Sequence, residues 1–147
     1  MATDFPTADH LLSLRLVFDT AAVVLIWLVQ LVIYPAFSRF TGPAFRVWHP
    51  VYTRRVTYVV LPIMLGQLAL YVYLVAQQAV PVTVLNLGLI GVAWALTFFG
   101  AVPIHRRLDG PEDHLPAVKR LLRVNAARTA VWTIVWGHTL LSAFWYG

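Results

Sequence analysis

The chain contains 147 residues, of which 60% are apolar and 12% charged, and its mean hydropathy is +0.73. An ordinary soluble domain has about 25% charged residues, and a single core of this size cannot bury so much apolar sequence. Composition therefore excludes a water-soluble globule. It predicts an integral membrane protein whose principal partner is the lipid bilayer.

The net charge is +5, and the chain contains no cysteine. In a soluble protein an excess of basic residues would suggest nucleic acid, whereas in a membrane protein it belongs to the connections between helices. We therefore expect no nucleic-acid partner. The absence of cysteine excludes disulfides, thiolate metal sites and cysteine nucleophiles.

Four apolar segments are long enough to cross a bilayer, which takes about 20 helical residues. They cover residues 14–34, 56–76, 82–102 and 126–145. The sequence thus predicts an all-α fold, a polytopic membrane four-helix bundle that forms a single transmembrane domain over the whole chain.

Basic residues gather between the first and second segments and between the third and fourth. Residues 35–55 contain four arginines and no acid, and residues 105–125 contain five lysines or arginines. Lys and Arg accumulate on the cytoplasmic side of membrane proteins. We therefore predict a bacterial inner-membrane protein with both termini on the non-cytoplasmic side.

The two halves of the chain are similar in outline, which suggests two repeated helical hairpins. In each half a tryptophan, a proline and an arginine follow one another at similar spacing: Trp27, Pro35 and Arg39, then Trp94, Pro103 and Arg107. A duplicated hairpin would produce this pattern. The alternative is that any two membrane hairpins share proline and arginine at their cytoplasmic ends.

Polar side chains within membrane segments are costly unless they face the bundle interior, so each is a functional candidate. The larger group lies near the cytoplasmic ends of all four segments. His49, His105, Asn125 and Arg128 are the catalytic candidates. The binding candidates are Trp27, Gln30, Tyr34, Arg55, Trp94, Phe98, Thr129 and Trp132. Together they predict a pocket with imidazole, amide, phenol and guanidinium groups above a tryptophan-rich floor. The alternative is that arginines at helix ends, above all Arg54, Arg106 and Arg107, contact lipid headgroups.

A smaller polar group lies toward the opposite ends. Arg15 and Asp19 are four residues apart and are expected to form an ion pair on one helix face. Asn86 or His138 is the expected further partner of Asp19, and we favour structural pairing over a proton path. Gln67, near the middle of its segment, is expected to hydrogen-bond to another helix.

Metal ligation is weakly indicated. The chain has no HExxH motif, no histidine pair four residues apart and no carboxylate expected near His49 or His105, while Glu112 and Asp113 are expected to be solvated. We therefore predict no metal site and no cofactor. Haem held by two histidines would need two imidazoles facing each other at one depth, and His49 and His105 are the candidates.

The remaining chemistry suits a flat, lipophilic small molecule. A histidine near neutral pH can accept or donate a proton, and Asn125 with Arg128 could stabilise a developing enolate or phenolate. The aromatic residues would form the walls of such a site.

Two stretches, WALTFFGAVPIHRRL (94–108) and RVNAARTAVWT (123–133), resemble the P-[NH]-x-x-L and W-N-x-x-R-T patterns of the bacterial anthrone oxygenase-like domain of unknown function. WLVQLVIYPAF (27–37) and WHPVYTRRVTYVVLPIML (48–65) are similar to small four-helix bacterial membrane proteins near that group. The resemblance implies a four-helix membrane protein and a cofactor-free oxygenation of an anthrone to an anthraquinone. It points to Pro103, His105, Asn125, Arg128 and Thr129. His105 replaces the commoner asparagine, which puts an identical reaction in doubt.

The leading hypothesis is a membrane protein that binds a lipophilic aromatic or quinone-like molecule at its cytoplasmic end and acts as an oxidoreductase. Its rivals are a non-enzymatic membrane subunit or lipid-binding protein, and a haem-binding electron-transfer protein. Gly66, Gly88, Gly91 and Gly100 are expected to be close-packing positions. Because Gly88 and Gly91 could pack within the chain or between copies, the sequence leaves both a monomer and a homo-oligomer as alternatives.

Overall fold

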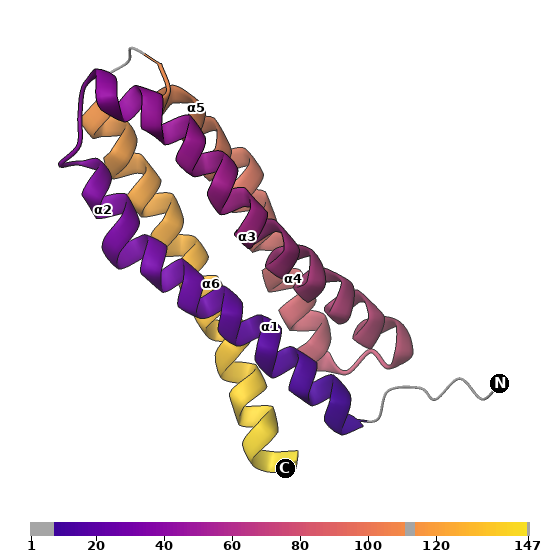
Figure 1. Ribbon diagram of the computed structural model, residues 1–147. Coiled ribbons are helices and arrows are strands. Elements are labelled where there is room, and N and C mark those ends of the chain that lie inside the picture. The colour runs from indigo at the N-terminus through magenta and orange to yellow at the C-terminus, as the bar shows by residue number, and fades with distance from the viewer. Residues whose placement is uncertain (1–7, 111–113, 147) are drawn as a thin grey trace.

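The computed structural model describes residues 8–110 and 114–146. These residues form four helical rods, arranged as an elongated bundle (Figure 1). The rods are α1–η1–α2 (Ala8–Leu28, Val29–Ile33, Tyr34–Phe37), α3 (Pro43–Gln77), α4–η2–α5 (Pro81–Ala95, Leu96–Ala101, Val102–Leu108) and α6 (His114–Tyr146), where η denotes a π-helix. No strand occurs in the described residues, and the predicted all-α fold is confirmed.

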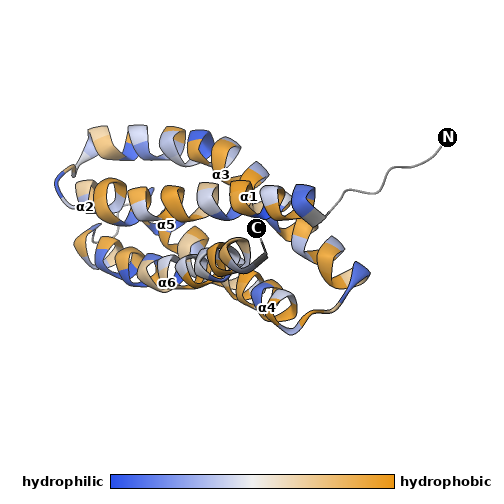
Figure 2. Cartoon of the chain, turned by 90° about the horizontal axis from the view of Figure 1, so that it is seen from below, coloured by the Kyte–Doolittle hydropathy of each residue, from blue (hydrophilic) through white to orange (hydrophobic). Residues whose placement is uncertain are grey.

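Three rods are long and apolar enough to cross a membrane, namely Asp9–Phe37, Pro43–Gln77 and Pro81–Leu108. The fourth, α6, has 33 residues, contains the predicted segment 126–145 and lies against α1 and α4. Hydrophobic residues occur along all the rods, and hydrophilic residues mark the connection between α2 and α3 (Figure 2). The chain is a helical membrane protein.

The predicted membrane segments lie inside the rods, but two helices begin well before them. α3 starts at Pro43, where the segment was expected at residue 56, and α6 starts at His114, where it was expected at residue 126. The basic stretches before these segments are therefore largely helical. Hydropathy marks only the part of a helix that lies in hydrocarbon, and long basic side chains let a helix continue into the interface.

The first and third rods share an irregularity. Each contains a π-helix followed by a proline in the first turn of the next helix, Pro35 in α2 and Pro103 in α5. Proline has no N–H to donate to the preceding turn, and a π-helix accommodates one extra residue in a helical turn. This common order of α-helix, π-helix and proline favours the interpretation of two repeated hairpins.

Glycines allow close helix contacts at two of the four expected positions. A Cβ at Gly66 would collide with the ring of Phe18, and one at Gly100 would lie 2.8 Å from a methyl group of Val124. Gly88 and Gly91 are exposed, with no atom within 4 Å of an added Cβ. The expectation of close packing is therefore wrong for these two within the chain.

Candidate functional site

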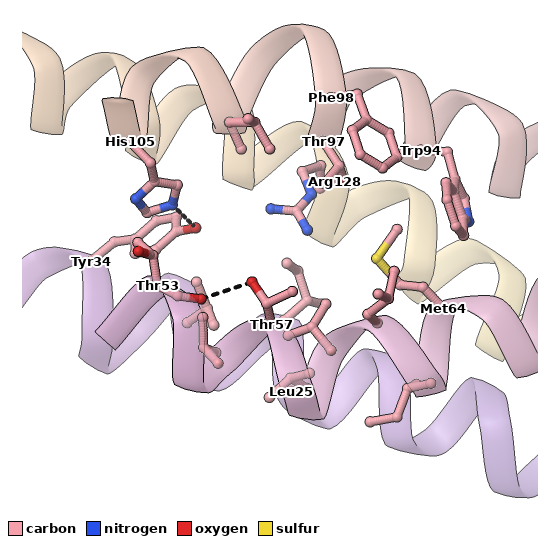
Figure 3. A pocket seen from close by; sticks show the side chains of 18 of the residues that line it. Leu25, Tyr34, Thr53, Thr57, Met64, Trp94, Thr97, Phe98, His105 and Arg128 are labelled. Carbon is pink, nitrogen blue, oxygen red and sulfur yellow. Dashed lines mark hydrogen bonds between the residues drawn. The ribbon is translucent and has the colours of Figure 1, made fainter. Parts of the chain in front are cut away.

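A cavity of about 400 Å³ lies inside the bundle between α3 and the α4–η2–α5 rod, with α1 and α6 behind it (Figure 3). This is within the size range of small-molecule sites. Most of its lining is apolar and aromatic. Six of the predicted site residues contribute to its wall: Tyr34, Trp94, Phe98, His105, Arg128 and Trp132.

The cavity opens sideways. Its exposed lining residues include Arg54, Thr57 and Leu61 on α3 and Phe98 and Arg106 on η2–α5, whereas its lining residues on α1 and α6 are buried or half-buried. The mouth therefore lies between α3 and the third rod, along the flank of the bundle. A molecule dissolved in the bilayer can reach the cavity through this flank.

A chain of hydrogen bonds starts at the cavity wall. The hydroxyl of Tyr34 lies 2.9 Å from Nε2 of His105, and Nδ1 of His105 lies 3.0 Å from Nε2 of His49. Nδ1 of His49 lies 2.6 Å from Oδ1 of Asp109. The side chain of His49 is completely buried, whereas that of Asp109 is 36% exposed. The four groups thus connect the buried wall of the cavity to Asp109, an exposed residue that also lines it.

Donor and acceptor roles follow from the carboxylate at one end of this chain. An ionised Asp109 only accepts, so Nδ1 of His49 donates to it. With a neutral His49, Nε2 of His49 accepts from Nδ1 of His105, and Nε2 of His105 accepts the Tyr34 hydroxyl proton. The Tyr34 hydroxyl also faces the Arg128 guanidinium.

Aromatic packing holds His49 in place. The ring of Phe45 stacks on it with centroids 5.0 Å apart, and the ring of His105 stacks on it at 5.2 Å. Phe37 contacts His49 edge-on at 5.3 Å. The imidazole therefore has little freedom to rotate away from its two hydrogen-bond partners.

Arg128 is the buried cation of the cavity. It comes from α6, is 5% exposed, and its guanidinium points into the space between the rods (Figure 3). Nη1 donates to Oδ1 of Asn125 at 3.2 Å, and the guanidinium lies over the ring of Trp132 at 5.2 Å. Its Nε has no hydrogen-bond partner, and no carboxylate lies within 4 Å among the described residues. A buried cation with an unused donor is suited to an anionic or strongly accepting oxygen.

Asn125 positions Arg128 and does not reach the cavity. Its amide nitrogen donates to Oε1 of Gln30 at 2.9 Å, which leaves its oxygen to accept from Arg128. Thr129 donates to the backbone oxygen of Asn125 at 2.9 Å. These three predicted residues therefore hold the Arg128 guanidinium in place without lining the cavity themselves.

Two predicted binding residues are away from the cavity. The indole of Trp27 is 43% exposed and donates to Thr133, and Arg55 is exposed on α3. Sequence reasoning also missed part of the lining, including Tyr52, Thr53, Thr57, Thr97 and Asp109. The three threonine hydroxyls donate to backbone oxygens of their own helices, so their remaining lone pairs add acceptors to an otherwise apolar wall.

The expectation that no carboxylate lies near His49 is wrong, because Asp109 contacts it directly. Among the described residues, however, no group of three metal-ligating side chains is arranged to hold an ion. Glu112 and Asp113 lie outside the described residues. The two imidazoles are hydrogen-bonded to each other, so in this arrangement no space for haem iron separates their facing nitrogens.

A second polar cluster surrounds Asp19 toward the other end of the bundle. Oδ1 of Asp19 accepts from Gln67 at 2.7 Å, and Oδ2 accepts from Tyr71 at 2.7 Å and Thr139 at 2.6 Å. Gln67 in turn accepts the indole N–H of Trp132 at 2.9 Å. The predicted cross-helix hydrogen bond of Gln67 is confirmed, and three helices, α1, α3 and α6, meet at this carboxylate.

The predicted partners of Asp19 act one step away from it. Nη2 of Arg15 donates to Thr139 at 3.1 Å, so the expected direct ion pair is wrong. Asn86 lies 3.4 Å from the Tyr71 hydroxyl and accepts a hydrogen bond from Nδ1 of His138 at 2.7 Å. The polar groups of this cluster are hydrogen-bonded to one another between the helices, which supports a structural role.

Comparison of the chain with protein-family models, curated proteins and solved structures finds no match.

Proposed function

We propose that this membrane protein binds a flat, lipophilic aromatic or quinone-like molecule in the cavity, with an oxygen of that molecule against Arg128. The observation that carries the proposal is a buried guanidinium on the wall of an apolar, aromatic cavity, with no carboxylate within 4 Å among the described residues. A buried cation without an anionic partner is expensive, so a ligand oxygen would stabilise the site. The indole nitrogen of Trp94 is a second buried donor without a partner on the same wall.

We further propose that the bound molecule is oxidised by dioxygen without a cofactor, as the resemblance to the anthrone oxygenase-like domain implies. One anthrone and one dioxygen give one anthraquinone and one water. The methylene carbon loses two hydrogens and gains an oxygen, while the second oxygen atom of dioxygen leaves as water. The organic substrate is oxidised, and dioxygen is reduced.

The residues on the cavity wall suit the first step of this reaction, which removes a proton from the methylene carbon. Tyr34 and His105 are hydrogen-bonded to each other and both line the cavity, so this pair is the proton acceptor. The resulting enolate carries its charge on oxygen, where Arg128 stabilises it. Trp94, Phe98 and Trp132 contact the rings of the substrate.

The site lies at the end of the bundle that carries most of the basic residues. The positive-inside rule supports a cytoplasmic location for this end and an inner-membrane location for the protein, with both termini on the opposite side. Cysteine residues added at position 147 and in the connection at residues 40–42 would be labelled by a membrane-impermeant maleimide from opposite sides. Labelling of the connection in intact cells would contradict this orientation.

Binding is tested with 1,8-dihydroxyanthrone, titrated without oxygen into protein reconstituted in lipid nanodiscs, with tryptophan fluorescence as the signal. We expect saturable quenching, because two tryptophans line the cavity. Arg128→Lys keeps the charge but loses the planar donor fork, and we expect it to weaken binding by about tenfold or more. Arg123→Lys alters an exposed residue of the same helix and is the matched control. Equal affinities of both variants and the wild type would contradict the proposal.

The oxidation is tested by admitting oxygen to the same samples. We expect anthraquinone to form with one dioxygen consumed per product, measured by absorbance and an oxygen electrode. The rate with Arg128→Lys should fall by about 100-fold or more, as for loss of an oxyanion donor. Binding without turnover above the protein-free rate would contradict the enzymatic part and leave a binding protein.

The alternative is a non-enzymatic membrane subunit or a lipid-binding protein. Arg54 and Arg106 at the mouth of the cavity favour it, since both could contact a lipid phosphate. It predicts that Arg128→Lys is nearly silent and that co-purified phospholipid competes with the probe. Haem-binding electron transfer is the other alternative, and a Soret band in the absorption spectrum of the purified protein would support it.

A further inference from the structure

His49 is a buried, doubly hydrogen-bonded histidine that does not line the cavity. Binding of a ligand does not require it, and a hydrophobic ring would fill the same aromatic cluster without two buried nitrogens to satisfy. Its two nitrogens instead join His105 to Asp109, at 3.0 and 2.6 Å. A histidine at position 49 is thus explained by the hydrogen bonds through which it joins His105 to Asp109.

We propose that Tyr34, His105, His49 and Asp109 form a proton path from the buried wall of the cavity to the exposed carboxylate at its edge. The proposal deepens the proposed function, on which it rests for the identity of the proton donor. Every link is within hydrogen-bonding distance, and each of the three inner groups can accept a proton on one side while it donates one on the other. The outer end is accessible, because the Asp109 side chain is 36% exposed.

The proton transfer balances along the path. The substrate proton moves to the Tyr34 oxygen as the Tyr34 hydroxyl proton moves to Nε2 of His105. The Nδ1 proton of His105 moves to Nε2 of His49, and the Nδ1 proton of His49 moves to the Asp109 carboxylate. The substrate becomes an anion beside Arg128, and Asp109 becomes neutral, so no net charge remains on either imidazole.

The return of the proton resets the path. Oxidation of an anthrone by dioxygen releases water and no net proton, so the proton stored on Asp109 travels back as water forms. Each imidazole then regains the Nδ1 proton with which it started. Because all four groups end as they began, the path needs no external acid or base.

The charged and titratable groups that face the path come from α3 and α6. Tyr52 on α3 contacts His49, with ring centroids 6.1 Å apart, and Arg128 on α6 faces the Tyr34 end. His114 on α6 lies against Phe45 and is hydrogen-bonded to the Phe37 carbonyl oxygen. Arg128 holds the anion at the cavity end and disfavours a positive charge on His105, so the proton moves toward Asp109.

The first experiment needs no ligand. Nitrogen-15 NMR of histidine-labelled protein in detergent micelles reports which imidazole nitrogens carry protons. We expect His49 and His105 to be neutral, with Nδ1 protonated in both and a scalar coupling between Nε2 of His49 and Nδ1 of His105. Protonated Nε2 in His49 of the resting protein, or the absence of this coupling, would overturn the path.

The second experiment uses alizarin, a hydroxylated anthraquinone whose phenolate absorbs at longer wavelength than its phenol. Stopped-flow mixing with protein in nanodiscs measures the rate at which phenolate forms, and equilibrium titration measures binding separately. We expect His49→Gln, at a residue outside the cavity lining, to bind alizarin within about threefold of the wild type, and Asp109→Asn, at a lining residue, is compared at saturating alizarin. Phenolate formation should slow by about tenfold or more, as for loss of an acid–base group. His138→Gln, a histidine at the other end of the bundle, is the control.

Chemical rescue separates proton transfer from a merely structural role. We expect formate to restore the rate of Asp109→Ala, because a small carboxylate can occupy the exposed outer end of the path. Rates equal to the wild type in both path variants, or a rate that falls only in proportion to lost binding, would overturn the proposal. If alizarin fails to bind even the wild type, the proposed function fails, and the resting tautomers of His49 and His105 still decide the path.

Discussion

Replacing Asp19 by asparagine tests whether the buried carboxylate organises the bundle. The change is nearly isosteric, but it substitutes an NH₂ donor for one acceptor. All three neighbours, Gln67, Tyr71 and Thr139, donate to Asp19. If the new NH₂ takes the place of Oδ1, it faces the Gln67 NH₂; if it takes the place of Oδ2, the Tyr71 and Thr139 hydroxyls must turn away and give up their hydrogen bonds to residue 19.

Rearrangement of the neighbours does not remove this conflict. If the asparagine NH₂ faces Gln67, the Gln67 amide must flip to accept from it. That flip turns the Gln67 NH₂ toward the indole N–H of Trp132, which now donates to Gln67 at 2.9 Å. The mismatch has only moved along the chain of hydrogen bonds.

One buried donor without an acceptor costs about 1–3 kcal/mol. Hydrogen bonds between membrane helices measure about 0.6 kcal/mol on average, which favours the lower half of that range. We therefore expect Asp19→Asn to lower the free energy of unfolding by about 1–2 kcal/mol, a factor of about 5 to 30 in the unfolding equilibrium.

The assay is reversible unfolding in mixed micelles with increasing SDS, followed by tryptophan fluorescence and circular dichroism. Asp9→Asn is the matched control, because Asp9 is an exposed residue in the first turn of the same helix. If both variants change the unfolding free energy by less than about 0.5 kcal/mol, the size of an ordinary surface substitution, the reasoning about the Asp19 cluster is refuted.

Three further substitutions test packing and the cavity. Gly66→Ala places a methyl group against the ring of Phe18 and should destabilise the protein by about 1–3 kcal/mol in the same unfolding assay. Gly88→Ala, in open space, should be neutral or stabilising by up to about 1 kcal/mol; equal effects of the two would contradict the described helix contact. Trp94→Phe removes an indole N–H that has no partner, so stability should hold while the affinity for 1,8-dihydroxyanthrone falls several-fold; unchanged affinity would show that this donor does not meet the ligand. Tyr34→Phe should retain binding in the fluorescence titration but slow anthraquinone formation by about 100-fold, and a normal rate would exclude Tyr34 from proton transfer.

The membrane helices could be predicted from the sequence because hydropathy is a local, additive property of about 20 consecutive residues. The ends of α3 and α6 could not, because their first turns are basic and lie beyond the apolar segments. Which polar residues gather at one level was also accessible, since helix length converts sequence position into depth. Six of the predicted residues therefore do line one cavity.

The faces on which those residues lie were harder to predict. In a regular α-helix Trp27, Gln30 and Tyr34 would share one face. Here the π-helix η1, Val29–Ile33, interrupts the α-helix. One extra residue in a turn rotates everything beyond it by about 100° relative to an α-helix. Trp27 is accordingly half-exposed and Tyr34 is buried at the cavity. Pro35 was the visible signal, since proline within a long apolar helix indicates an irregular turn.

Sequence spacing was the poorest guide to which side chains are hydrogen-bonded to each other. Asp109 lies four residues after His105, a spacing that favours contact on one helix, yet it binds His49 from α3. Arg15 and Asp19 have the same spacing, but hydroxyl and amide donors from two other helices surround the carboxylate. Both outcomes depend on how separate helices pack, which a single sequence without its structure does not reveal.

Because the cavity opens on the flank of the bundle, the ligand concentration that determines its occupancy is the concentration in the membrane. A ligand that arrives through the flank between α3 and η2–α5 is supplied from the bilayer, so occupancy depends on the ratio of ligand to lipid and not on moles per litre of buffer. Adding empty vesicles or detergent would dilute the ligand without changing its total amount, and an affinity expressed per volume of water would drift with every preparation. In a cell the same property would let a sparingly soluble molecule saturate the site while almost none of it is free in water.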